Sequence, residues 1–66
     1  MPLVRVEIWS GRTPEVKKQL AEAITNAVVE HIGCTAQGVT VIIDEVPKEN
    51  WVIGGKTCQE LFPNVP

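Results

Sequence analysis

The 66-residue sequence has few of the residues that small proteins use for covalent or metal cross-links. Its two cysteines, Cys34 and Cys58, form no CxxC pair, and His31 is its one histidine. We therefore expect free thiols and no metal site, since a structural metal site needs several cysteine or histidine ligands. His31 comes late in a predicted helix and is interpreted as a helix-end or surface residue.

The sequence also lacks blocks of like charge and long apolar runs. Six Lys and Arg against eight Asp and Glu give a net charge of −2, which predicts no nucleic-acid or anionic membrane partner. No run approaches the ~18 apolar residues of a membrane span. The N-terminal stretch MPLVRVEIW has charges from its fifth position, unlike a signal peptide, so we expect a cytoplasmic protein.

The apolar content is high for one small domain spanning residues 1–66. Hydrophobic residues make up 44% of the chain and include Trp9 and Trp51. A domain of this size buries only about 60% of the surface that its unfolded chain exposes. This excess predicts an oligomer, with a compact monomer of apolar surface as the alternative.

The hydrophobic pattern of the first half predicts a strand followed by a helix. Residues 3–9 alternate apolar and charged side chains, which is typical of a half-buried strand. Thr13-Pro14 is a helix start and Gly33 a helix end. Between them, apolar residues spaced by three and four predict one buried stripe: Val16, Leu20, Ile24, Ala27, Val28 and Ile32.

The second half predicts a loop at 34–38, then a strand over 39–46 that is apolar enough to be interior and parallel to the first. A turn at 47–50 and the Gly54-Gly55 pair predict a short C-terminal hairpin. Residues 56–66 are expected to be a loose tail or to lie on another subunit. The fold class is therefore α+β, a β-α-β unit whose uncovered sheet face a second copy would cover.

Several short segments together match one known family. They are Met1-Pro2, residues 7–12 with the Gly11-Arg12 turn, residues 41–45, Trp51, and Ile53-Gly54-Gly55. From Met1 to about Lys56 the chain resembles the 4-oxalocrotonate tautomerase family. The resemblance implies sheets paired between subunits, commonly in a hexamer built as a trimer of dimers, or a dimer. It also implies a small carboxylate substrate, and neither a metal nor an organic cofactor.

Pro2 is the first candidate catalytic residue. A proline in this position permits removal of Met1, which leaves a secondary amine at the N-terminus. An α-amino group has a pKa of about 7.7–8.0, and an apolar pocket with nearby cations lowers it. A base poised near neutral pH suits general base catalysis, the role that the resemblance implies. The alternative is that Pro2 merely begins an edge strand.

Arg12 and the two tryptophans are the next candidates. Arg12 lies in the predicted strand-to-helix turn, where a guanidinium can hold a carboxylate through two parallel hydrogen bonds. The resemblance implies that Arg12 binds the substrate carboxylate and draws electron density from it. It also implies that Trp51 walls the pocket and that the backbone amide at Trp9 contributes to it. Interface packing is the alternative for both tryptophans.

Thr40 is the main departure from the family, whose well-studied enzymes carry an arginine here that polarises the substrate from a neighbouring subunit. Threonine offers one hydrogen bond but no charge, and losing such a donor costs roughly 10²–10³ in rate. The sequence therefore argues against proficient action on the dicarboxylate that gives the family its name. Three residues are candidates for a compensating cation: Arg5, Lys48 and Lys56.

The expected function is interconversion of the enol and keto forms of a small unsaturated 2-oxo or 2-hydroxy acid by Pro2. One alternative is a dehalogenase or decarboxylase acting on short unsaturated acids, which needs an acidic residue to activate water. Candidates for that residue are Glu7, Asp44, Glu45 and Glu49. A second alternative, kept open by Thr40, is a non-catalytic or helper subunit of a mixed oligomer.

Overall fold

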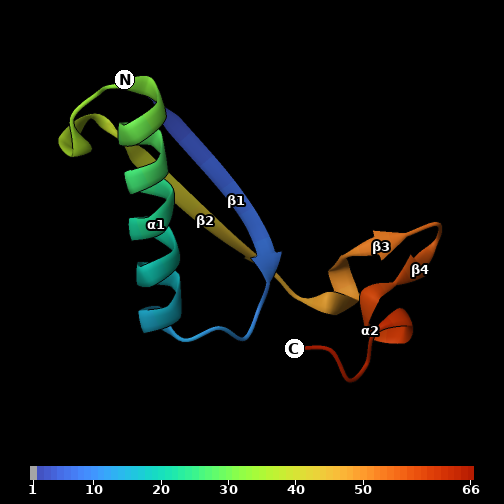
Figure 1. Cartoon of the computed structure of the whole chain (residues 1–66). Coiled ribbons are helices and arrows are strands. Elements are labelled where there is room, and N and C mark those ends of the chain that lie inside the picture. Colours follow the sequence, from blue (N-terminus) through green and yellow to red (C-terminus); the bar gives the residue numbers. More distant parts are fainter. Residues whose placement is uncertain (1) are drawn as a thin grey trace.

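The computed structural model describes residues 2–66. Strands β1 (Leu3–Trp9) and β2 (Thr40–Val46) lie side by side as a parallel pair, and helix α1 (Pro14–Ile32) packs across one face of it (Figure 1). This confirms the predicted β-α-β unit, with β2 beginning at Thr40. Parallel strands need a long crossover, and α1 supplies it.

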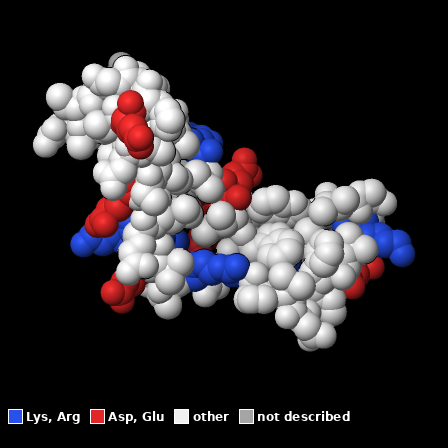
Figure 2. Space-filling model, viewed as in Figure 1, with Lys and Arg blue, Asp and Glu red and all other residues white. Residues whose placement is uncertain are grey.

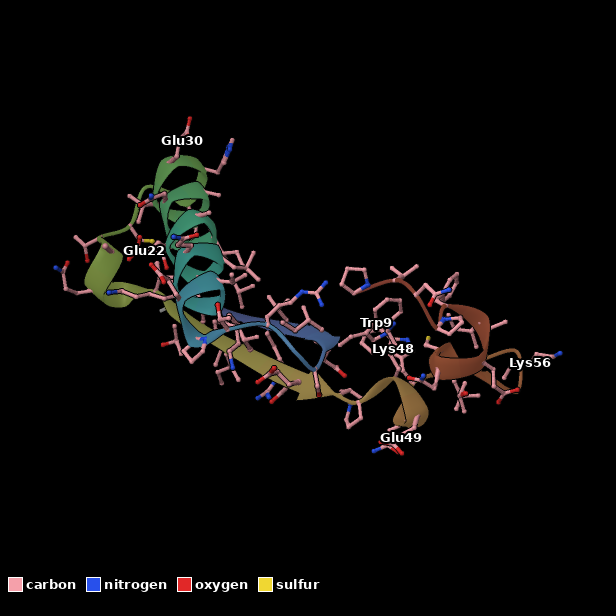
Figure 3. The ribbon with its side chains drawn as sticks, turned by 90° about the horizontal axis from the view of Figure 1, so that it is seen from below. Trp9, Glu22, Glu30, Lys48, Glu49 and Lys56 are labelled. Atoms are coloured by element: carbon pink, nitrogen blue, oxygen red, sulfur yellow. The ribbon has the colours of Figure 1, made fainter. Side chains whose placement is uncertain are left out.

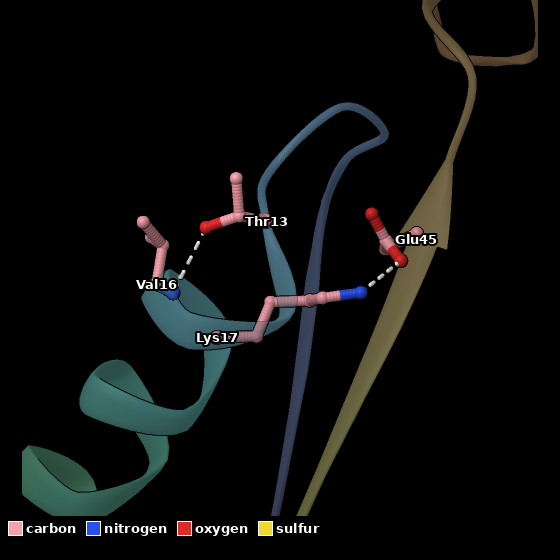
Figure 4. Close-up of polar contacts among 4 residues, drawn as sticks. All are labelled: Thr13, Val16, Lys17 and Glu45. Atoms are coloured by element: carbon pink, nitrogen blue, oxygen red, sulfur yellow. Dashed lines mark hydrogen bonds and ion pairs between the residues drawn. The ribbon is translucent and has the colours of Figure 1, made fainter.

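Helix α1 begins and ends where the sequence predicts. The Thr13 side chain accepts a hydrogen bond from the Val16 N–H at 3.2 Å, as Figure 4 shows, and Pro14 takes the first helical position. Gly33 ends the helix with φ of 85°, and its N–H donates to the Val29 carbonyl at 2.9 Å. These local contacts fix the length of the crossover.

The predicted apolar stripe of α1 is only partly correct. Leu20, Ile24 and Val28 are half-buried as expected, whereas Val16 is 48% and Ile32 65% exposed. Val16 and Ile32 lie at the two ends of the helix, and a sheet of two strands covers only its middle. Ala27, also predicted in the stripe, is exposed within the helix. Three further residues on the packed side were not predicted to be there and are half-buried: Ala21, Thr25 and Val29.

The register gives the sheet one covered and one open face. Residues paired across parallel strands stand on the same face, so Ile8 shares the helix-covered face with Glu45. The open face carries four pairs: Leu3 with Thr40, Arg5 with Ile42, Glu7 with Asp44, and Trp9 with Val46. In the described part of the chain β2 pairs with β1 alone, so the prediction of an interior strand is wrong for a single copy. Its outer edge has no strand beside it there.

Beyond β2 the chain leaves the sheet and forms a small projecting unit (Figure 1). The 3-10 turn Lys48–Asn50 leads into the antiparallel hairpin of β3 (Val52–Ile53) and β4 (Lys56–Thr57), which confirms the predicted hairpin. A second 3-10 turn, Ala36–Gly38, precedes β2. Helix α2 (Cys58–Leu61) follows β4 directly.

Of the two expectations for residues 56–66, a loose tail is wrong, because the segment contains β4 and α2, while contact with another subunit stays a prediction. Thr57 caps α2 by accepting the Glu60 N–H at 3.2 Å, while the Glu60 carboxylate accepts the Thr57 N–H at 3.3 Å. This reciprocal capping box satisfies two free donors and orders the short helix. The residues after α2 then turn back toward the end of the sheet, as the site geometry below describes.

A single copy has almost no closed core. Its radius of gyration is 14.7 Å, against about 11 Å for a compact chain of this length. Its accessible surface is 4833 Å², against about 4,100 Å² for a compact protein of this mass. Among the described residues only Cys58 is fully buried. The structure therefore contradicts the alternative of a compact monomer.

Charged side chains do not form a large area of one sign on the face drawn in Figure 2. Acidic and basic groups alternate along α1 and the sheet, and most of that face is uncharged. No helix within residues 2–66 is long and apolar enough to cross a membrane.

Candidate active site

Pro2 lies at the start of the sheet beside Thr40. Its carbonyl oxygen accepts a hydrogen bond from the Thr40 N–H at 3.0 Å, and Leu3 then pairs with Thr40 in the register. Pro2 is half-buried and Thr40 exposed. Met1 lies outside the described residues, so its predicted removal is outside them too. The structure thus puts the candidate base next to the position where the charged residue is missing.

Arg12 lies at the opposite end of β1, in the predicted strand-to-helix turn. The Ser10 N–H donates to the Val46 carbonyl at 3.0 Å, which holds the start of the turn against β2. Gly11 has φ of 121°, a backbone conformation that other residues rarely adopt. The half-buried Arg12 follows, and its Nη2 donates to the Pro66 carbonyl oxygen at 2.7 Å.

Glu45 braces this turn from β2. Lys17 Nζ lies 2.6 Å from Glu45 Oε1 (Figure 4), and this hydrogen bond is the main cause that lowers the pKa of Glu45. Burial is the second-largest effect and raises the pKa, while the charge of Lys17 and a hydrogen bond from the Gly11 backbone each lower it by less. The Glu45 carboxylate therefore contacts both the first turns of α1 and the loop that contains Arg12.

Three aromatic rings gather at the same end of the sheet. The rings of Trp9 and Trp51 meet edge to face with centroids 6.3 Å apart, and Phe62 lies tilted against Trp9 at 5.8 Å. The Cys58 N–H donates to the Trp51 carbonyl at 2.7 Å, which fixes α2 beside this group. Lys48 Nζ sits 4.8 Å from the centre of the Trp9 ring.

The predicted site residues thus fall into two groups within one chain. Trp9, Arg12 and Trp51 come together at one end of the sheet, and Pro2 with Thr40 at the other. The seven residues of β1 separate them, which at the strand rise of about 3.3 Å per residue is about 23 Å. No side chain spans that distance, so a single copy does not bring Pro2 and Arg12 together.

The candidate compensating cations differ in their surroundings. Arg5 is paired with Asp44 on the open sheet face, with Nη1 3.0 Å from Oδ2. Lys56 is exposed on β4, at the far end of the hairpin, whereas Lys48 lies against Trp9 (Figure 3). Lys48 is therefore the candidate that lies with the Arg12 group. His31 is exposed in the last turn of α1, as predicted.

Two hollows on the single chain lie along α1 instead of at either group. One, of about 460 Å³, is lined by the first turns of the helix, including Pro14 and Lys18. The other, of about 450 Å³, lies between the middle of the helix and Ala36. Neither includes Pro2, Arg12 or Trp51, so neither is a candidate for the active site.

Phe62 is the member of this group that the sequence prediction missed. It lay in the segment expected to be loose, and its contact with Trp9 joins residues 53 positions apart, for which no local pattern gives a signal. The Thr57-x-x-Glu60 spacing was the available clue that the segment is ordered.

A family model described as tautomerase enzyme matches residues 2–60 of this chain. The chain belongs to the tautomerase family. Its relatives include the 2-hydroxymuconate tautomerase of Comamonas testosteroni, 43% identical over 92% of this chain and 97% of its own. A probable tautomerase of Bacillus cereus is 45% identical over 91% of this chain and 98% of its own.

Solved structures of tautomerases share the fold. A 4-oxalocrotonate tautomerase isozyme from Methylibium petroleiphilum superposes with a TM-score of 0.87 at 39% identity, covering 92% of this chain and 98% of its own. A heterohexameric 4-oxalocrotonate tautomerase from Chloroflexus aurantiacus gives 0.86 at 36% identity, with the same coverage. The protein is thus a 4-oxalocrotonate tautomerase-like isomerase with the fold of that family, which confirms the resemblance read from the sequence.

Proposed function

We propose that this tautomerase interconverts the enol and keto forms of a small unsaturated 2-oxo or 2-hydroxy acid. After removal of Met1, the Pro2 amine takes the proton of the 2-hydroxyl group and returns it to a carbon of the conjugated chain. One O–H bond breaks, one C–H bond forms, and the double bonds shift between them. No other reactant is needed, since the proton that leaves is the one that returns.

Arg12 has the chemistry to hold the substrate carboxylate. Its planar guanidinium offers two parallel donors, which match the two oxygens of a carboxylate. Trp51 and Trp9 beside it supply an apolar wall, which lowers the local dielectric and strengthens the charge interaction. A dry wall near the Pro2 amine also disfavours its protonated form.

The separation of Pro2 from Arg12 along β1 carries the proposal that the site is shared between copies. A complete site needs Pro2 from one copy and the Trp9–Arg12–Trp51 end of another. The open sheet face, the free edge of β2 and the near absence of a closed core all support assembly. A homo-oligomer fits these features, either a dimer or a hexamer built as a trimer of dimers.

A second candidate function is that of a partner subunit in a mixed oligomer. The Chloroflexus aurantiacus relative is a heterohexamer, and Thr40 lacks the positive charge that a different chain could contribute. In that case the pure chain is inactive and gains activity when mixed with a second, similar chain. The dehalogenase and decarboxylase alternative has less support, because Asp44 and Glu45 are already paired with Arg5 and Lys17.

The test uses the full chain produced with its native N-terminus and checked by mass for loss of Met1. Ketonisation of phenylenolpyruvate and 2-hydroxymuconate is followed for the native protein and for Pro2→Ala. We expect the substitution to lower kcat roughly 10²–10⁴-fold, the usual contribution of a general base. An inert native chain, or an unchanged rate in the variant, contradicts the proposal.

Two expectations from the sequence have no bearing on this test. The single domain over 1–66 and the cytoplasmic location remain predictions.

A further inference from the structure

The C-terminal residues 62–66 cross the Arg12 end of the sheet and are held there by two cations. Lys48 Nζ donates to the Phe62 carbonyl at 2.7 Å and also to the Val65 carbonyl. Arg12 Nη2 donates to the Pro66 carbonyl at 2.7 Å. Lys48 and Arg12 therefore bind carbonyl oxygens of neighbouring residues, which puts their charged ends on two oxygens close together.

An aromatic ring lies under Lys48, one of these two cations. Trp9 contacts Lys48 on its ring face and Phe62 beside it, and Figure 3 shows Lys48 and Trp9 next to each other where the tail passes. A cation held against an aromatic ring is partly desolvated, so an oxygen that it contacts is bound more strongly than in water. The arrangement suits a flat ligand with two neighbouring oxygens.

The acceptors at Lys48 are weaker than those of two other cations of the chain. Arg5 and Lys17 are paired with carboxylates, whereas Lys48 is paired with the neutral carbonyls of Phe62 and Val65. An ammonium group is attracted more strongly by the full negative charge of an anion than by the partial charge of a carbonyl oxygen. An anionic ligand therefore has an advantage over the tail at Lys48.

Resting on the function proposed above, we propose that Lys48 is the second cation of the substrate site and supplies the charge that Thr40 does not. Arg12 binds the carboxylate of a 2-oxo acid and Lys48 binds its 2-oxo oxygen, with Trp9 beneath. The carbonyls of Val65 and Pro66 occupy these positions until the substrate displaces them. Lys48 then stabilises the negative charge that develops on the 2-oxo oxygen as the proton moves.

Two ligands that do not react can distinguish binding of the 2-oxo oxygen by Lys48 from a general effect of its charge. Benzoylformate carries a carboxylate and a 2-oxo group but no hydrogen that could enolise, and benzoate carries the carboxylate alone. Their dissociation constants are measured by calorimetry on the full chain. Lys48→Met should weaken benzoylformate about tenfold or more, the usual loss for a hydrogen bond to a charged group, and leave benzoate unchanged. Arg12→Ala should weaken both.

Three further variants control for structure. Lys56→Met removes an exposed lysine on the hairpin and should change neither ligand. Lys48→Arg keeps the charge and should restore most of the benzoylformate binding. Lys48→Gln repeats the loss with a polar side chain, in case Lys48→Met is poorly folded by circular dichroism.

Phe62→Ala distinguishes a substrate cation from a residue that merely anchors the tail. Loosening the tail frees both cations, so we expect both ligands to bind more tightly, opposite to the effect of Lys48→Met. The proposal is overturned if Lys48→Met weakens both ligands equally or neither, or if Phe62→Ala weakens benzoylformate as Lys48→Met does. These binding results stand apart from the activity of Pro2→Ala, so failure here and failure of the proposed function are distinguishable.

Discussion

The two ends of the β1–β2 pair differ in the contacts that they make. At the Pro2 end the backbone alone makes the contact, from the Thr40 N–H to the Pro2 carbonyl, and Thr40 is exposed and uncharged. At the Arg12 end, three rings, two cations and the returning tail gather over the last residues of the strands. The comparison teaches that the candidate base and the candidate carboxylate-binding residue are separated within one copy, so the proposed function needs an assembly to bring them together.

After Pro2→Ala, the largest expected effect is at the Arg12 end. Arg12→Ala removes the proposed two-pronged contact with the substrate carboxylate and should lower kcat/KM roughly 100-fold or more. Arg12→Lys keeps the charge but loses the two parallel donors of the guanidinium, so its kcat/KM should lie between those of the native chain and Arg12→Ala. Steady-state ketonisation of phenylenolpyruvate measures both. Lys18→Ala, an exposed cation on α1, is the control and should have the native rate; a native rate for Arg12→Ala removes this end from the site.

A gain of function is expected at the Pro2 end. Thr40→Arg places a cation beside Pro2 and should raise kcat/KM for the dicarboxylate 2-hydroxymuconate by about tenfold, since a charged donor acts on the second carboxylate. Phenylenolpyruvate, with one carboxylate, should gain less. Gln37→Arg makes the same charge change at a nearby exposed position and should change neither rate. If kcat/KM rose equally in Thr40→Arg and Gln37→Arg, the cause would be the added net charge and not its position beside Pro2.

The turn that presents Arg12 gives a stability prediction. Gly11→Ala must adopt φ of 121°, so it should lower the free energy of unfolding by about 1–2 kcal/mol, although an added Cβ meets no atom within 4 Å. Gly38→Ala is the matched control, because its Cβ would make only an ordinary contact with Thr35 at 3.7 Å. Urea denaturation of both variants measures the difference, and equal losses would refute the backbone explanation.

The smallest expected effect is the pH dependence of the Lys17–Glu45 pair. The pKa of Glu45 is lower in the folded chain than in the unfolded one. At pH values between these two pKa values, the unfolded state therefore binds more protons than the folded state. The stability from this pair is therefore present above the unfolded pKa and is lost as the pH falls through the folded pKa. The stability of Glu45→Gln should therefore fall less than that of the native chain as the pH is lowered. Circular dichroism between about pH 5 and 3 measures this.

Lys17→Met provides the internal control for that measurement. It removes the main cause of the lowered pKa, so it should flatten the acid transition to a similar extent, and the double variant should add little. Additive effects of the two substitutions would mean that other groups set the acid response.

Local signals in the sequence predicted the fold, whereas contacts between distant residues were beyond them. Thr13, Pro14 and Gly33 bound α1 through contacts with neighbours three or four positions away, and the structure has them as predicted. The ordered conformation of the tail depends on the contacts of Phe62 with Lys48 and Trp9. No spacing of residues in the sequence predicts these contacts. The same reason explains why the predicted burial of Val16 failed, since the width of the sheet decides it.

The candidate residues Pro2, Arg12 and Trp51 could be named from the sequence, and their roles stay predictions. The elements on which they lie follow the predicted order of strand, turn, helix and strand, whereas the distances between them could not be predicted. Their division between the two ends of β1 follows from the length of the strand, which becomes evident only once the register is known.

Mixing two inactive variants tests the central claim most directly. Pro2→Ala and Arg12→Ala are each assayed alone, then unfolded together in equal amounts and refolded. If each site takes Pro2 from one copy and Arg12 from another, about one site in four in the random mixture has both residues intact, and activity returns. If both residues of a site came from the same chain, the mixture would stay as inactive as its parts, and that result would contradict the account.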